Sequence, residues 1–196
     1  MIQAHGGKLV DRVLSGKKKD EALARAGRLA RLVIDSELVS DVENIATGVY
    51  SPLEGFLGEA DFRSVLAGSR LRTDVAWTIP IVLDADRKAA DPLKLGEDVL
   101  LTAEDGRALA ILHLQEKYGY DKSETAEKIF GTHDPAHPGV AKVLGMKEVL
   151  LAGPVDLLEV TPTPFDRWKL TPKETRVLFE AKGWRTVVGF QTRNTP

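Results

Sequence analysis

The sequence predicts an α+β protein in which a β-rich N-terminal domain is followed by the first helix and strand of an α/β domain. The first observation is a series of short segments with a two-residue apolar period, separated by helical patterns, between positions 77 and 160. The second is the run Thr161-Pro162-Thr163-Pro164, because two prolines in four residues interrupt ladders and helices alike. We therefore place a domain boundary here, with residues 1–162 as the first domain and residues 163–196 as the truncated start of the second.

The composition is that of a globular chain long enough to bury a core: 196 residues, 43% hydrophobic and 29% charged. A net charge of -2 lacks the basic footprint of a nucleic-acid binder. There is no cysteine, which excludes disulfides and thiolate metal sites. No signal peptide stands at the N-terminus, and no run approaches the roughly 18 apolar residues of a membrane span. We therefore expect a cytoplasmic protein with no nucleic-acid or membrane partner.

The first part of the chain predicts helices. Residues 20–33 place apolar side chains at three- and four-residue steps, as on one face of an amphipathic helix. Ser40 and Glu43 form a capping-box pattern for a short helix that Gly48 can end. Residues 61–71, after Gly58, predict another helix.

The period then changes to that of strands. Residues 77–83 alternate, although Pro80 cannot donate to a ladder and so indicates an edge or a break. Residues 98–103 and 107–115 predict a hairpin, because Asp105-Gly106 suits its turn. The elements expected next are a helix from Asp121 to Gly131, a short helix at 140–144, and strands at 148–152 and 155–160.

Beyond the boundary the pattern is helix, strand and loop. Thr171, Pro172 and Glu174 predict a capped helix that Gly183 ends. Residues 185–190, RTVVGF, then predict a short buried strand of the kind found in α/β sheets.

The polar segment that follows this strand is the candidate site. Ligands of open α/β sheets bind beyond the carboxyl ends of the strands. Gln191, Thr192, Arg193 and Asn194 offer a guanidinium fork and neutral donors, which suit the oxygens of phosphate or sulfate. On the residues alone, an exposed polar loop is the alternative interpretation.

The segment from Thr132 to Gly139 contains two histidines four residues apart, His133 and His137. Such a pair shares a metal only on a helix, and Pro135 and Pro138 disfavour a helix there, so we predict a turn. The sequence contains neither a P-loop nor a nucleophile elbow.

Several stretches, taken together and in order, resemble the ATP sulfurylase (sulfate adenylyltransferase) family. They cover essentially the whole chain: His5-Gly6-Gly7, GVYSPLEGFL at 48–57, WTIPIVL at 77–83, Phe130-Gly131-Thr132 with HPGV at 137–140, Gly153-Pro154, and VGFQTRN at 188–194. The resemblance implies a PUA-like β-rich N-terminal domain followed by a nucleotidyltransferase-type α/β catalytic domain.

The resemblance also implies the site. Carried over, Gln191 and Arg193 would bind sulfate, Gln191 and Asn194 would contact ATP, and Thr192, Arg193 and Asn194 would form the catalytic set, with no metal ligand among them. The implied reaction is direct attack of sulfate on the α-phosphate of ATP, giving adenylyl sulfate and pyrophosphate. Because both reactants are anions, catalysis rests on positioning and charge neutralisation, with Mg²⁺ on the pyrophosphate.

One departure from the family pattern is an H-x-x-H pair, which family members carry after QTRN and this sequence lacks. We therefore expect an N-terminal part of the enzyme that is inactive alone, either within a homo-oligomer or lacking the C-terminal catalytic part. The alternatives are a non-catalytic PUA-like binding module, for instance for RNA, and a structural half that joins a second polypeptide.

Overall fold

The computed structural model describes residues 3–190. Within them, seven strands form one curled sheet whose order is β1-β4-β5-β7-β2, with β3 and β6 also paired to β7. The strands are β1 (Ala30–Ile34), β2 (Gly55–Phe56), β3 (Leu83–Ala85), β4 (Asp98–Ala103), β5 (Ala108–His113), β6 (Glu116–Gly119) and β7 (Val149–Leu157). β1 runs parallel to β4, and the other pairings are antiparallel.

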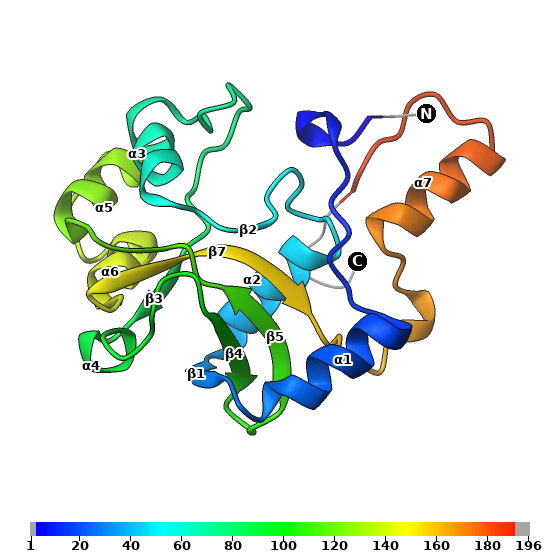
Figure 1. The fold of residues 1–196 in the computed structure, drawn as a ribbon. Helices are drawn as coiled ribbons and strands as arrows, with labels where there is room; N and C mark the ends of the chain where they lie inside the picture. The colour runs from blue at the N-terminus through cyan, green and yellow to red at the C-terminus, as the bar shows by residue number, and fades with distance from the viewer. Residues whose placement is uncertain (1–2, 191–196) are drawn as a thin grey trace.

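Helices surround this sheet at both ends of the molecule (Figure 1). They are α1 (Gly16–Ala26), α2 (Ser36–Ala46), α3 (Glu59–Gly68), α4 (Arg87–Ala90), α5 (Lys122–Phe130), α6 (Pro138–Gly145), α7 (Pro172–Ala181) and the 3-10 turns η1 (His5–Gly7) and η2 (Asp166–Trp168). In Figure 1, α3, α5 and α6 gather at one end, and α1 and α7 lie at the other. No helix in the described part of the chain combines the length and the apolar character needed to cross a membrane.

Strand β7 is the centre of the sheet. Its first half pairs with β3 on one side and β6 on the other, and its second half pairs with β2 and β5. The sequence predicted two strands here, at 148–152 and 155–160. The structure has one continuous strand, since the change of partners at Gly153 bends the sheet without ending it.

The buried core lies on both faces of the β4–β5 hairpin. Val99 and Leu101 face α2 in the main cluster, whereas Leu100 and Ile111 meet Ala22 and other residues under α1. Burial on both faces explains why the middle residues of β4 and β5 are mostly apolar, and the predicted hairpin is confirmed.

Three predictions between residues 20 and 83 need correction. The helix expected at 20–33 ends at Ala26, and residues 30–34 form β1, because the backbone of that segment pairs with β4. The short helix begins at Ser36 with Asp35 as its N-cap, so the Ser40 pattern is not a cap. Of the strand expected at 77–83, only Leu83 is in a ladder, as the first residue of β3.

Other expectations are confirmed. Helix α5 is capped by Asp121, whose carboxylate accepts a hydrogen bond from the Glu124 N–H at 2.9 Å, and it ends at Gly131 with a φ of 69°. Helix α3 begins after Gly58, and α6 covers the short helix expected at 140–144. Asp121 and Gly131 therefore allowed both ends of α5 to be predicted from local sequence alone.

Candidate functional site

The four residues of the predicted site, Gln191, Thr192, Arg193 and Asn194, lie outside the described residues. Their roles therefore stay predictions, and the structure describes only the segment that leads to them. That segment consists of helix α7 and residues 182–190.

Helix α7 begins with the predicted capping box. The Thr171 hydroxyl accepts a hydrogen bond from the Glu174 N–H at 3.2 Å, and the Glu174 carboxylate accepts one from the Thr171 N–H at 2.7 Å. The hydrogen bonds that the Thr171 N–H and hydroxyl donate to the Glu174 carboxylate lower the pKa of Glu174. Gly183, with a φ of 67°, follows the last turn, so both predicted helix ends are confirmed.

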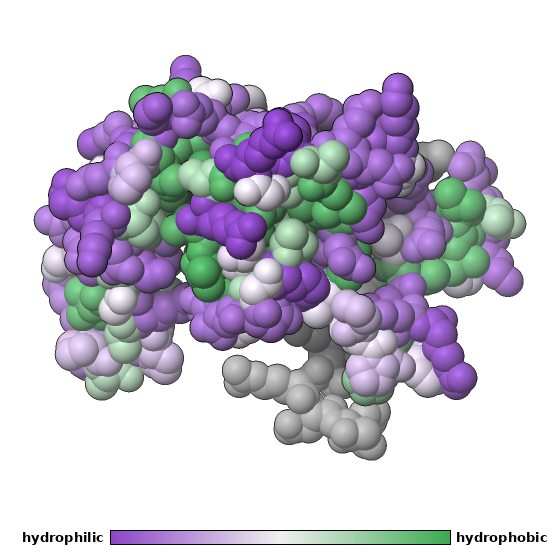
Figure 2. Space-filling view, turned by 60° about the horizontal axis from the view of Figure 1, so that its bottom comes forward, coloured by the Kyte–Doolittle hydropathy of each residue, from purple (hydrophilic) through white to green (hydrophobic). Residues whose placement is uncertain are grey.

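The strand expected at 185–190 is not formed within the described residues. Residues 186–190 pair with no other segment there, and Val188 and Phe190 are 92% and 89% exposed. Helix α7 also buries no side chain completely, and Lys173 reaches Asp11 at 3.1 Å. A strand needs a partner for its backbone groups, and residues 3–190 supply none for this one. Apolar residues are also exposed on α7 itself, among them Val177 and Leu178, and Figure 2 shows apolar surface at that end of the molecule.

The two histidines of the Pro-rich segment have separate structural roles. Nδ1 of His137 accepts a hydrogen bond from the Gly139 N–H at 3.1 Å, so His137 is the N-cap of α6. His133 lies 3.4 Å from a carboxylate oxygen of Glu127. Among the residues that the structure describes, no three metal-ligating side chains converge on one point.

A chain of hydrogen-bonded ionisable side chains that the sequence did not reveal crosses the sheet. The ring of His113 contacts Asp98 at 2.6 Å and Asp156 at 2.8 Å, one carboxylate on each nitrogen. Arg12 extends the chain by contacting Asp156 at 2.8 Å, and Arg25 pairs with Asp98. One signal was available, since the predicted hairpin places Asp98 directly opposite His113. The chain ties the N-terminal segment and α1 to the sheet.

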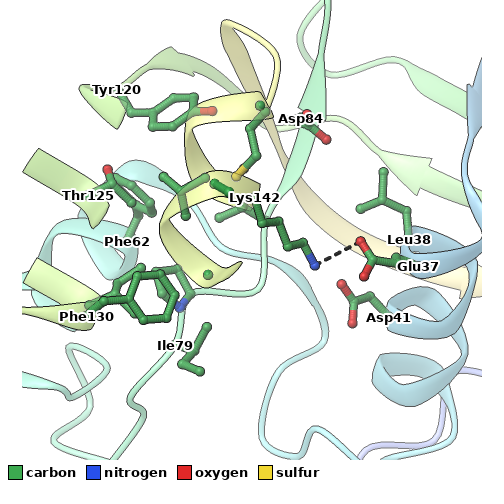
Figure 3. Close-up of a pocket in the computed structure, with 18 of the residues that line it drawn as sticks. Glu37, Leu38, Asp41, Phe62, Ile79, Asp84, Tyr120, Thr125, Phe130 and Lys142 are labelled. Atoms are coloured by element: carbon green, nitrogen blue, oxygen red, sulfur yellow. Dashed lines mark ion pairs between the residues drawn. The ribbon is translucent and has the colours of Figure 1, made fainter. Parts of the chain in front are cut away.

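The structure also contains a cavity of about 360 Å³ that the sequence did not predict. It lies between α2, α5, α6 and the loop before β3 (Figure 3). Figure 3 shows Phe62, Tyr120 and Phe130 on one side and acidic side chains on the other. The lining residues are spread over positions 35 to 146, so no local sequence motif predicts the cavity.

The charges of this cavity are unbalanced. Its lining includes Asp35, Glu37, Asp41 and Asp84 but only one basic residue, Lys142, whose Nζ contacts Glu37 at 2.9 Å. Burial raises the pKa of Asp41 more than its hydrogen bond with Tyr50 and the charge of Lys142 lower it. The nearby carboxylates, chiefly Glu37 through its hydrogen bond, raise the pKa of Lys142.

Comparison with known families agrees with this architecture. A family model described as a PUA-like domain matches residues 2–160. The fold is therefore that of a PUA-like domain, as the sequence resemblance implied. A second model, described as ATP-sulfurylase, matches residues 166–196.

Curated relatives extend the match across the chain. A sulfate adenylyltransferase of Hyperthermus butylicus is 50% identical over 192 residues, which are 98% of this chain and 49% of the relative. One from Symbiobacterium thermophilum is 47% identical over 193 residues, again 98% of this chain and 49% of the relative. The chain belongs to the PUA-like domain family over residues 2–160, and its last residues match the ATP-sulfurylase model. It spans about half the length of the curated relatives it matches.

A solved structure shares the fold. The hexameric APS kinase from Thiobacillus denitrificans is 29% identical, with a TM-score of 0.72 over 94% of this chain and 32% of that protein. The α+β arrangement is thus found in an experimentally solved relative.

Proposed function

We propose that the protein is a sulfate adenylyltransferase, which joins ATP and sulfate to give adenylyl sulfate and pyrophosphate. The observation that carries this proposal is the ATP-sulfurylase match over residues 166–196, which includes QTRN. Curated relatives named sulfate adenylyltransferase support the proposal, because their sequence identity is 50% and 47% over 98% of this chain.

The proposed roles follow from the chemistry of QTRN. Arg193 presents a planar fork of donors that can pair with two sulfate oxygens, and Gln191 adds a neutral donor to sulfate and contacts ATP. Asn194 contacts ATP, and Thr192 completes the catalytic set. Sulfate is a weak nucleophile and both substrates are anions, so holding the two in line and neutralising their repulsion is the main catalytic task.

Magnesium enters this proposal with the nucleotide. A cation on the β- and γ-phosphates would neutralise the charge that develops on the departing pyrophosphate. The proposed site residues are an arginine, two amides and a hydroxyl, a donor set suited to anions rather than to Mg²⁺, which prefers carboxylates and water. The metal would therefore be bound through ATP.

The division of the chain at the proline-rich run belongs to the same proposal. Residues 1–162 would be the PUA-like domain and residues 163–196 the start of the catalytic domain. The two family matches support this division, since one ends at residue 160 and the other begins at residue 166. Assembly into a homo-oligomer is supported by the hexameric relative and by the exposed apolar side chains near α7.

The direct test is product formation by the protein expressed from its own gene. With radioactive sulfate, ATP and Mg²⁺, we expect labelled adenylyl sulfate and equimolar pyrophosphate. Pyrophosphatase should increase the yield, because it removes a product of the reaction. Absence of labelled adenylyl sulfate from a folded protein, with ATP and sulfate at saturating concentrations, would contradict the proposal.

A further inference from the structure

The acidic and aromatic cavity between α2, α5, α6 and the loop before β3 has the form of a small-molecule site. Its volume of about 360 Å³ falls in the range of ligand pockets, which are concave, mostly apolar and carry a few placed polar groups. We propose that this cavity binds a small organic cation, an ammonium or guanidinium group attached to an apolar body.

The acidic side of the cavity determines the charge of the ligand. Glu37 and Lys142 pair with each other at the rim, where their side chains are 68% and 62% exposed. Asp35 is used in the fold, since its carboxylate caps α2 by accepting from the Leu38 N–H at 2.9 Å. These three groups therefore have partners without any ligand.

Asp41 and Asp84 differ from these three groups because no cation is paired with them among residues 3–190. Each is half-buried, and each accepts one hydrogen bond: Asp41 from the Tyr50 hydroxyl at 3.3 Å and Asp84 from the Lys147 N–H at 2.7 Å. A half-buried carboxylate gains most from a cation that approaches it in a partly desolvated site.

The opposite side of the cavity determines the body of the ligand. Phe62, Tyr120 and Phe130 present their rings there, and Ile79 adds an aliphatic wall from the loop. Aromatic faces attract organic cations and bury apolar groups, so one ligand can satisfy both walls.

Two other ligand classes fit less well. An anion would meet four carboxylates and one lysine that is already paired. A divalent metal needs oxygen ligands converging on one point, and no three such side chains converge in the part of the chain that the structure describes. Dispersed carboxylates suit a cation whose charge is spread over several hydrogen-bond donors.

The raised pKa of Asp41 agrees with a cationic ligand. Its raised pKa has burial as the main cause, with Asp35 and Glu37 on α2 also raising it and Tyr50 and Lys142 lowering it. A bound cation would stabilise the charged form and lower this pKa. Binding should therefore release a proton and weaken as the pH falls through the raised pKa of Asp41.

The test compares three probes that share a phenyl body: 2-phenylethylamine, 2-phenylethanol and 3-phenylpropanoate. Each is titrated into the ¹⁵N-labelled 196-residue chain, and amide chemical shifts report both the affinity and the place of binding. We expect the amine to shift residues around Asp41, Thr125 and Phe130 and to bind about tenfold more tightly than the alcohol. We expect no saturable binding of the carboxylate.

Variants separate the acidic wall from general charge. Asp41→Asn keeps the shape and the hydrogen-bond acceptor for Tyr50, so the fold should persist, and it should weaken amine binding about three- to tenfold and flatten its pH dependence. Asp20→Asn on α1 removes the same charge far from the cavity and should change neither.

Equal affinity for the amine and the alcohol would overturn the proposal, because the cavity would then be a non-selective apolar pocket. Unchanged amine binding by Asp41→Asn, or shifts that map elsewhere, would overturn it as well. Unperturbed amide shifts away from the cavity establish that each variant is folded. Because these readouts need no catalysis, they are independent of the proposed sulfate adenylyltransferase activity.

Discussion

Glu54 shows how single residues hold the N-terminal segment against the sheet. Its carboxylate pairs with Lys8 and with Arg12, whose Nη1 lies 3.3 Å away. Arg12 in turn donates to the Val155 carbonyl of β7 at 2.7 Å. The hydrogen bond from Lys8 is the main cause of the lowered pKa of Glu54, with Arg12 contributing less.

Replacement of Lys8 by methionine should lower the free energy of unfolding near neutral pH by less than about 1 kcal/mol, because the Glu54 side chain is 40% exposed and water screens the pair. The folded pKa of Glu54 is below its ordinary value, so this stability is present above the unfolded pKa and is lost as the pH falls through the folded pKa.

Urea unfolding of the two proteins at several pH values checks this, with Lys18→Met as a control that removes the same charge where no ion pair is found among residues 3–190. A difference between Lys8→Met and the parent that stayed constant down to acidic pH would contradict the assignment to Glu54.

Among the elements, β7 depends on one glycine. At Gly153 the strand changes partners, and its φ of 148° is a conformation that side chains rarely adopt. A Cβ atom there would lie 2.0 Å from the carbonyl oxygen of His113. The backbones of β5 and β7 can therefore approach only because residue 153 has no side chain.

Gly153→Ala should accordingly cost about 3 kcal/mol or more of unfolding free energy, since backbone atoms on both strands must move. Gly119→Ala in β6 is the matched control, because a Cβ at Gly119 meets nothing within 4 Å. We expect the control to change stability by less than about 1 kcal/mol. Chemical denaturation distinguishes the two, and equal effects would show that close approach at Gly153 is unimportant.

How far the sequence predicted these elements depended on the range of the interactions. Helix caps and hairpin turns depend on interactions between residues a few positions apart, and the elements that contain them were predicted correctly. The examples are Asp121, Gly131, Thr171 and the Asp105-Gly106 turn. The β1 strand was mistaken for helix because its pairing partner in β4 lies about seventy residues away, and the local apolar spacing fits either structure.

The candidate sites divide in the same way. QTRN is contiguous and stands in the sequence as a motif, so the amino-acid sequence alone is enough to propose it. The acidic and aromatic cavity is assembled from α2, α3, α5, α6, β3 and neighbouring loops, and none of its residues forms a motif within its own segment. Only the packing of these elements brings Asp41 opposite Phe130.

At the scale of the whole molecule, the PUA-like part contains the core, and α7 lies beside it. The buried clusters use no residue beyond Leu158, although Thr161 is bonded to Glu43 and Arg107. Beyond Pro162 the chain adds the exposed ion pair between Lys173 and Asp11.

A chain ending at residue 162 should therefore fold alone, with a free energy of unfolding within about 1 kcal/mol of that of the 196-residue chain. Urea unfolding followed by circular dichroism measures both. A loss of several kcal/mol would mean that residues 163–196 belong to the same cooperative unit, against the proposed domain boundary.

The central claim is that Arg193 binds sulfate in an adenylyl transfer reaction. Its most direct measurement is sulfate-dependent exchange of labelled pyrophosphate into ATP by the protein expressed from its own gene, as the parent and as Arg193→Ala. We predict that exchange requires sulfate and falls about a hundredfold or more in Arg193→Ala, while Arg185→Ala, a nearby exposed arginine, stays close to the parent. Sulfate-dependent exchange at the parental rate in Arg193→Ala would contradict the account.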